Sequence, residues 1–181
     1  LNSISKQLTN INIIYASSED SNSLDNMCKQ AKLILTTVGP YDLYGEPLIQ
    51  SCIKNKSHYV DLTGEPQFVH RMSNKYNNKA IEQNVAIINC CGFESIPPDV
   101  GTYHSVKQMK SKSIEVNYFL QTHGTISGGT WASFLNSIIS KQPIIKIKSS
   151  RKNKIKKLYY DKNLEKWAMI FPVIDKQIVM K

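Results

Sequence analysis

Short apolar runs rich in β-branched residues alternate along this chain with segments of helical periodicity. The apolar runs span residues 11–16, 32–38, 58–62, 85–89 and 113–121. The helical segments span residues 24–31, 46–55, 65–84, 96–106 and 130–140. Strands separated by single helices are typical of βαβ units, which build a parallel sheet. This alternation restricts the chain to an α/β fold more tightly than any other feature of its sequence.

A parallel sheet also indicates where a ligand would bind. Right-handed crossovers pack helices against the sheet, and we expect helices on both of its faces. Ligands of such sheets bind beyond the carboxyl ends of the strands. A functional site is therefore expected in the loops that follow the strands, and three of these loops have unusual sequences.

The positive charge of the chain is concentrated in one segment. The 181 residues carry a net charge of +9, yet residues 1–140 hold 11 Lys and Arg against 11 Asp and Glu. Residues 141–162 hold nine basic residues and one acid, a local charge of +8. Basic and apolar residues are interleaved there, which fits a solvated loop, an anionic membrane surface or a nucleic-acid contact. No nucleic-acid-binding motif accompanies the segment, so we expect no nucleic-acid partner.

Several patterns are absent from the sequence. It has no run of about 18 apolar residues and no secretory signal pattern, so we expect no transmembrane helix and an intracellular protein. Its four cysteines include no CxxC pair, which favours reduced thiols and no metal site, with a catalytic thiol at Cys90 or Cys91 as the alternative. The chain begins with Leu1 rather than Met and ends in an apolar run, so we expect a piece of a longer protein.

The first unusual loop reads VGPYDLYGEP and leads into the helix expected from Glu46. Gly39 allows the backbone to approach a ligand closely, and Pro40 stiffens the chain behind it. Tyr41 and Tyr44 each offer an aromatic ring for stacking and a hydroxyl for hydrogen bonding. The alternative is a tight turn whose aromatic side chains are packed.

The second unusual loop reads DLTGEPQ. Asp61 places a carboxylate at a strand end in an apolar context, where it needs a partner. Glu65 precedes a proline at the expected start of the next helix, where the helix dipole favours an acid. Capping of that helix by Thr63 and Glu65 is the alternative to a role in a site.

The third unusual loop reads NCCGFESIPPDVG. Gly92 ends a strand, Ser95 suits the cap of the next helix, and Pro97 and Pro98 suit its first turn. Main-chain N–H groups at this helix start could bind an anion or a polar edge of a substrate. An ordinary capped turn is the alternative, but three glycine-bearing loops at one edge of one sheet argue for a site.

Taken in order, the three loops resemble one known family. VGPYDLYGEP, YVDLTGEP and CGFESIPPDVG follow one another as they do in the saccharopine dehydrogenase-like oxidoreductases, a broad group that includes trans-acting enoyl reductases. GGTWAS at 128–133 and WAMIFPVIDKQIV at 167–179 fit the same family. The resemblance covers residues 11–181 and is strongest from 36 to 103.

The resemblance implies an incomplete Rossmann-type, doubly wound parallel sheet that runs into part of a second α+β domain. Residues 1–112 would be the C-terminal part of the NAD(P)-binding domain, and residues 113–181 the start of the second domain, with a basic loop at 141–162. The family's first βαβ unit, with the glycine-rich turn that holds the dinucleotide pyrophosphate, is missing from this sequence. The implied cofactor is NAD(P), and the family favours NADP.

The resemblance also implies roles for individual residues. The cofactor-binding residues would be Val38, Gly39, Pro40, Tyr41, Tyr44 and Gly45. The substrate pocket would be formed by Asp61, Glu65, Gly92, Phe93, Glu94 and Ser95. Tyr41 is the first candidate for a catalytic acid–base residue, and His104 is the second.

The family implies part of an NAD(P)-dependent oxidoreductase that acts on a small-molecule or lipid-like substrate. The alternative is a non-catalytic, Rossmann-derived module that binds an anionic membrane through the basic segment. Animal members of the family carry an apolar segment further downstream, which fits association with a membrane or a lipid droplet.

Overall fold

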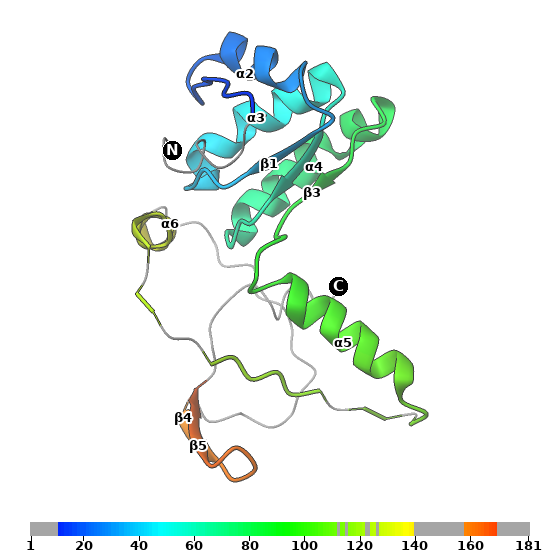
Figure 1. Ribbon diagram of the computed structural model, residues 1–181, viewed down its shortest axis with the longest axis vertical. Helices are drawn as coiled ribbons and strands as arrows, with labels where there is room; N and C mark the ends of the chain where they lie inside the picture. Colours follow the sequence, from blue (N-terminus) through cyan, green and yellow to red (C-terminus); the bar gives the residue numbers. More distant parts are fainter. Residues whose placement is uncertain are drawn as a thin grey trace.

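The computed structural model places three parallel strands and their helices in one α/β unit (Figure 1). It describes residues 11–111, 113–114, 116–121, 124–125, 127–139 and 158–169. The other described elements are helices α5 (Ile96–Gln108) and α6 (Gly128–Ile139) and a hairpin of β4 (Leu158–Asp161) with β5 (Lys166–Met169). Most of the basic segment lies outside the described residues.

The α/β unit consists of one helix followed by two β-α-β crossovers. Helix α2 (Ser21–Cys28) precedes β1 (Leu33–Thr36), α3 (Tyr41–Asn55) connects β1 to β2 (His58–Asp61), and α4 (Pro66–Glu82) connects β2 to β3 (Ile87–Ile88). The three strands are parallel and lie in the order β1-β2-β3. This confirms the predicted α/β class and its parallel sheet.

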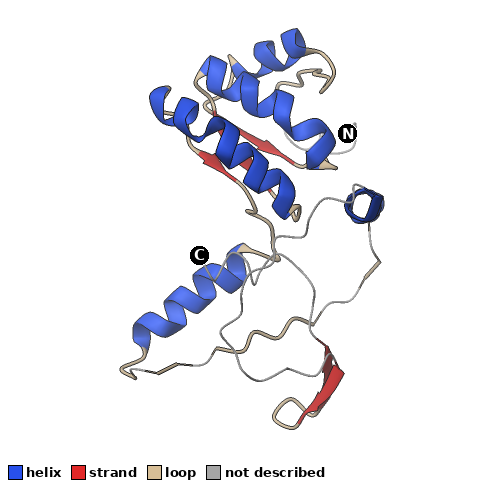
Figure 2. Ribbon diagram, turned by 180° about the vertical axis from the view of Figure 1, so that it is seen from behind, coloured by secondary structure: helices blue, strands red, loops and turns tan. Residues whose placement is uncertain are grey.

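Alternate residues of the strands face opposite sides of the sheet, and only one side is covered. Ile34 pairs with Tyr59 in the register, and Tyr59 is fully buried beneath the helices. Leu33, Leu35 and Ile88 alternate with these residues and are 50%, 61% and 52% exposed. Figure 2 shows the helices of the unit on one side of the strands. The other side is a bare apolar face.

The single covered face corrects our expectation of helices on both faces, within the described residues. Each right-handed crossover moves the chain one strand further in the same direction, from β1 to β2 and then to β3. Connecting helices of successive crossovers in one direction fall on the same face. A helix would reach the other face only where the direction of winding reverses, and it does not reverse between β1 and β3.

Helices α3 and α4 provide most of the core. The buried side chains of α4 recur every four residues, which confirms the predicted stripe of Phe68, Met72, Tyr76 and Ala80. The buried apolar side chains of α3 are Tyr41, Leu48, Ile49, Cys52 and Ile53. No helix among the described residues is long enough and apolar enough to cross a membrane.

Two predicted strands and one predicted helix start were wrong for the described residues. Residues 11–16 form no strand, and Tyr15 is 90% exposed, because no neighbouring strand is present there to pair with its backbone. The described residues of 113–121 form no strand either. Helix α3 begins at Tyr41 instead of Glu46, so Pro47 lies inside the helix and the predicted tyrosine-rich loop is mostly helical.

The packing of α3 against α4 generates a prediction about Gly45. A Cβ atom added at Gly45 would lie 2.5 Å from Cζ of the fully buried Phe68 ring. We expect Gly45→Ala to lower the free energy of unfolding by about 1–3 kcal/mol, because overpacking outweighs a helix-propensity gain of about 1 kcal/mol. Denaturant unfolding of the full-length protein measures this change. Gly101→Ala in α5, where a Cβ meets open space, is the control, and equal stability of the two variants would contradict the prediction.

Candidate functional site

The three parallel strands end at one edge of the sheet. Strand β1 ends at Thr36, β2 at Asp61 and β3 at Ile88. Since neighbouring parallel strands point the same way, the loops that follow them lie side by side. We call these loops, at residues 37–40, 62–65 and 89–95, the strand-end edge.

Glu65 in the second loop caps helix α3, which follows the first loop. Its carboxylate oxygens accept hydrogen bonds from the backbone N–H groups of Tyr41, at 3.0 Å, and Asp42, at 2.8 Å. The next two N–H groups of the helix donate to the carbonyl of Pro40, at 3.2 and 3.1 Å. All four amino-terminal N–H groups of α3 thus have partners. This explains why the helix begins at Tyr41, and it leaves none of these donors free for an anion.

Asp61 is fully buried at the end of β2, and its side chain accepts four hydrogen bonds. The Tyr59 hydroxyl and the Asn89 amide donate to Oδ2, at 2.9 and 2.6 Å. The backbone N–H groups of Thr63 and Cys90 donate to Oδ1, at 3.1 and 2.9 Å. Burial and the neighbouring Asp61 carboxylate raise the pKa of Tyr59. The partner that the sequence required for this carboxylate is therefore a set of protein donors on β2, the second loop and the third loop.

The third loop closes tightly on itself. The backbone N–H groups of Ser95 and Ile96 both donate to the carbonyl of Gly92, at 3.1 and 3.0 Å. The next two residues are prolines and have no N–H group. The predicted anion site at the start of this helix is therefore wrong. Ser95 occupies the N-cap position of α5, as predicted, and its carbonyl accepts the Asp99 N–H at 3.1 Å. Its buried side chain makes no capping hydrogen bond to the helix.

The structure separates the predicted site residues into an exposed set and a buried set. Val38, Tyr44, Phe93 and Glu94 are exposed, and Gly39 is half-buried. The buried set consists of Pro40, Tyr41, Gly45, Asp61, Glu65, Gly92 and Ser95. The exposed residues can reach a ligand directly, whereas the buried ones can act on it only by shaping the loops. Their individual roles in binding stay predictions.

One apolar side chain from each loop is exposed at the strand-end edge. Val38, Leu62 and Phe93 are 57%, 39% and 64% exposed, and we call them the apolar rim. Leu62 was not among the predicted residues, although it directly follows the buried Asp61, and successive residues of an extended chain point to opposite sides. A Cβ atom added at Gly92 would lie 3.2 Å from Cβ of Leu62, so the second and third loops are in contact.

Tyr41 lies in the core beneath the strand-end edge. It is 5% exposed, and its hydroxyl donates to the carbonyl of Thr36 at 3.3 Å. Burial, followed by the charge of Asp61, raises the pKa of Tyr41 to about 12. The hydroxyl is therefore neutral at pH 7. A catalytic role for Tyr41 stays a prediction, and this geometry favours a packing role.

His104 is not brought close to the strand-end edge. It is exposed in α5, nine residues after Ser95 in sequence, and its Nε2 contacts the side-chain amide of Gln108 at 2.5 Å. Nine helical residues correspond to about 14 Å along the helix axis. His104 and Tyr41 therefore do not lie close enough together in this structure to form one catalytic site. No group of His, Cys, Asp or Glu side chains among the described residues could hold a metal ion.

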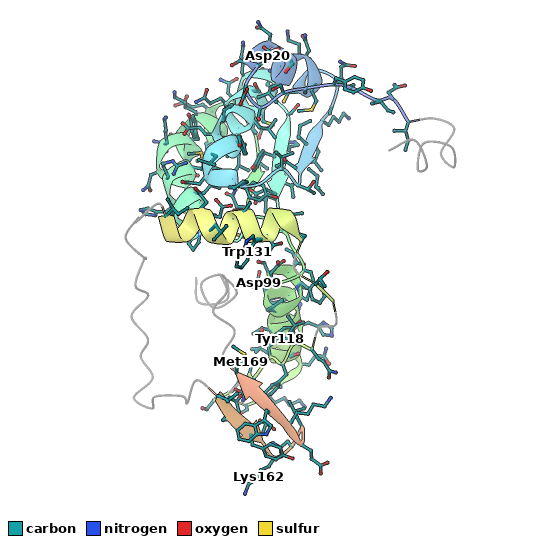
Figure 3. The ribbon with its side chains drawn as sticks, turned by 90° about the vertical axis from the view of Figure 1, so that its left-hand side faces the viewer. Asp20, Asp99, Tyr118, Trp131, Lys162 and Met169 are labelled. Carbon is teal, nitrogen blue, oxygen red and sulfur yellow. The ribbon has the colours of Figure 1, made fainter. Side chains whose placement is uncertain are left out.

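Helix α6 approaches the first loop from a distant part of the chain. A Cβ atom added at Gly39 would lie 3.3 Å from Oγ of Ser133. Figure 3 shows α6, with Trp131 labelled, lying across the end of the α/β unit. The GGTWAS and VGPY motifs are therefore adjacent in space.

Known proteins similar to this chain identify its family. The saccharopine dehydrogenase-like oxidoreductase of Mus musculus is 40% identical over 144 residues, which cover 77% of this chain and 34% of the mouse protein. This chain belongs to the saccharopine dehydrogenase-like oxidoreductase family. The loops of the strand-end edge contain residues of the three motifs by which the sequence resembles that family.

Two further relatives have different names. The lipid droplet localized protein of Caenorhabditis elegans is 37% identical over 116 residues, 64% of this chain and 27% of the relative. A Mycobacterium tuberculosis protein with the provisional name trans-acting enoyl reductase is 34% identical over 128 residues, 68% of this chain and 30% of the relative. This chain thus spans 27–34% of the length of these three relatives. No protein-family model and no solved structure matches the chain.

The buried Tyr41 hydroxyl generates a prediction about pH. Its pKa is about 12 in the folded protein, against 10.0 for an unperturbed tyrosine. The unfolded chain loses this proton first as pH rises, so the stability from Tyr41 is complete below about pH 10 and lost by about pH 12. We expect Tyr41→Phe to reduce the alkaline loss of stability, measured as the thermal midpoint at about pH 9 and about pH 12. The exposed Tyr103→Phe is the control. An unchanged pH dependence in Tyr41→Phe would contradict the prediction.

Proposed function

We propose that this chain is part of an NAD(P)-dependent oxidoreductase whose cofactor and substrate meet at the strand-end edge. The observation that carries the proposal is the convergence of three family motifs on one edge of a parallel sheet, with α6 against the first of them. Ligands of parallel α/β sheets bind at this edge. A bound nicotinamide would supply hydride transfer, and the residues of this chain would orient it and its substrate.

The described residues fit the nicotinamide end of a dinucleotide and not its pyrophosphate. Val38 and Gly39 offer an accessible surface for a ring and a ribose, and Tyr44, 37% exposed, adds an aromatic side chain with a hydroxyl. The N–H groups at the start of α3 have protein partners, and the start of α5 has two paired N–H groups and two prolines. We therefore propose that the pyrophosphate is held by a glycine-rich turn elsewhere in the whole protein, with NADP favoured over NAD.

The bare face of the sheet supports the proposal of an incomplete Rossmann fold. Leu33, Leu35 and Ile88 expose an apolar surface, whereas parallel sheets are normally covered on both faces. The relatives are about three times as long as their match to this chain, which leaves ample chain to cover it. In this proposal residues 1–112 form the C-terminal part of the cofactor domain, and residues 113–181 begin the second domain.

The apolar rim supports a lipid-like or otherwise apolar substrate. Val38, Leu62 and Phe93 are exposed apolar side chains from the three loops, and an apolar substrate that binds at the strand-end edge would bury them. The name of the mycobacterial relative fits the same class, since an enoyl group is a carbon–carbon double bond next to a carbonyl. We propose a hydride transfer to or from an apolar, unsaturated small molecule.

A second candidate function rests on the basic segment. Its local charge of +8 would attract an anionic bilayer, and one relative is named for localisation to lipid droplets. In this alternative the chain is a non-catalytic, Rossmann-derived module at a membrane or lipid-droplet surface. A measurement of cofactor binding distinguishes the two candidate functions, because only the oxidoreductase requires a cofactor.

Cofactor binding is tested at Gly39. A Cβ atom added at Gly39 would lie 3.3 Å from Oγ of Ser133 and 3.5 Å from the Tyr41 ring, contacts that shifts of a few tenths of an ångström relieve, so we expect a side chain there to occupy the cofactor surface without unfolding the protein. We expect Gly39→Val in the full-length protein to reduce NADPH affinity at least about tenfold with an unchanged thermal midpoint. Titration of NADPH fluorescence measures the affinity, with Gly101→Val as the control. Wild-type affinity in Gly39→Val would refute the assignment of this loop.

The membrane alternative is tested with the cluster RKNKIKK at 151–157. Replacement of its five basic residues by Gln should lower binding to vesicles that contain anionic lipid by at least about tenfold, since each charge contributes about 1 kcal/mol. Wild-type binding should also weaken at high salt. Vesicle co-sedimentation measures both effects. Equal binding of wild type and variant would exclude a role for this segment at a membrane.

A further inference from the structure

Residues 61–65 connect two loops of the strand-end edge through buried hydrogen bonds. The Thr63 N–H donates to Asp61 at 3.1 Å, and the Glu65 N–H donates to the Thr63 hydroxyl at 3.1 Å. Asp61, Thr63 and Glu65 are 0%, 1% and 9% exposed. We call these three residues the 61–65 link. Asp61, Thr63 and Glu65, every second residue of this segment, are therefore buried, and each is hydrogen-bonded to the next of the three.

The two ends of the 61–65 link reach different neighbours. At one end, Glu65 accepts the first two N–H groups of α3, directly after the first loop. At the other end, the Asp61 side chain accepts the Cys90 N–H and its carbonyl accepts the Cys91 N–H, at 2.9 and 2.7 Å. Cys90 has φ +62°, a left-handed conformation that a residue with a side chain rarely adopts without support. Asp61 thus holds a strained turn at the start of the third loop.

Capping of its own helix does not explain this arrangement. Glu65 occupies the N-cap position of α4, yet its side chain makes no capping hydrogen bond to that helix. Both carboxylate oxygens are used on α3, 23 and 24 residues earlier in the chain. A residue with only a local role would bond to its own helix start. The 61–65 link therefore connects the second loop to the start of α3 and to the third loop.

We propose that Asp61, Thr63 and Glu65 are positioning residues that set the first and third loops at a fixed separation, so that the cofactor surface at Val38–Gly39 and the substrate surface at Phe93–Glu94 stay aligned. This inference rests on the proposed function. The three residues touch neither ligand. They act through α3 and through the Cys90 turn, and a change at one end of the link is transmitted to the other end.

Thr63 offers the sharpest test, because it is the middle of the link and a matched pair of variants exists. Thr63→Val keeps the shape and removes the hydroxyl acceptor, while Thr63→Ser keeps the hydroxyl. In the full-length protein we expect Thr63→Val to speed amide hydrogen exchange at both Tyr41 and Cys90 about tenfold, and to weaken NADPH binding by a similar factor. Thr63→Ser should restore both to near wild type. Glu82→Gln, a change at the exposed end of α4, is the control.

The outcomes distinguish this inference from the proposed function. Faster exchange at Glu65 alone, with Tyr41 and Cys90 unchanged, would overturn the link as a connection between loops. Equal behaviour of Thr63→Val and Thr63→Ser would overturn the role of the hydroxyl. If the wild-type protein binds no NADPH, the proposed function fails, and hydrogen exchange still decides the link. If Thr63→Val does not fold, the same measurements on Glu65→Gln decide it, with Cys90 as the distant reporter.

Discussion

The described α/β unit depends on how a buried carboxylate at a strand end is satisfied. Asp61 is fully buried, and an unpaired charge there would cost several kcal/mol. Its four donors come from its own strand, from its own loop and from the residues after β3. This one side chain therefore joins the end of β2 to the residues after β3 and supports the strained turn at Cys90, beside the backbone pairing of the two strands. Glu65 is a second buried carboxylate whose donors come from another segment, because it accepts two backbone N–H groups at the start of α3 and so joins that helix to the second loop.

These two carboxylates also limit what the strand-end edge can bind. Helix starts at such an edge commonly hold phosphate, because their N–H groups are free and the helix dipole is positive there. Here the start of α3 is filled by Glu65, and the start of α5 is closed by Gly92 and two prolines. The accessible surface that remains is the apolar rim with Gly39 and Tyr44. An apolar or aromatic group suits this surface, and the phosphates of a dinucleotide do not.

The parallel sheet was predictable from the sequence because the patterns that specify its strands and connecting helices are local in the chain. Runs such as LILT and HYVD, each followed by a helical pattern, predict parallel strands with helical crossovers, and the three central strands formed as expected. The strand predicted at 11–16 did not form, because a strand requires a neighbour to satisfy its backbone, and the described chain provides none there. The covered face likewise followed from the direction of winding, which local patterns do not contain.

The sequence by itself determined the order of strands and helices, the loops in which a site would lie and the family to which the chain belongs. The tertiary structure decided which residues of those loops are accessible. Tyr41 looked like a ligand contact and is packed in the core, whereas Leu62 looked like an ordinary strand residue and is exposed. Glu65 looked like a cap for the helix that follows it and caps the preceding one. Periodicity and motifs report on neighbours along the chain, but burial and hydrogen-bond partners depend on segments that meet only after folding.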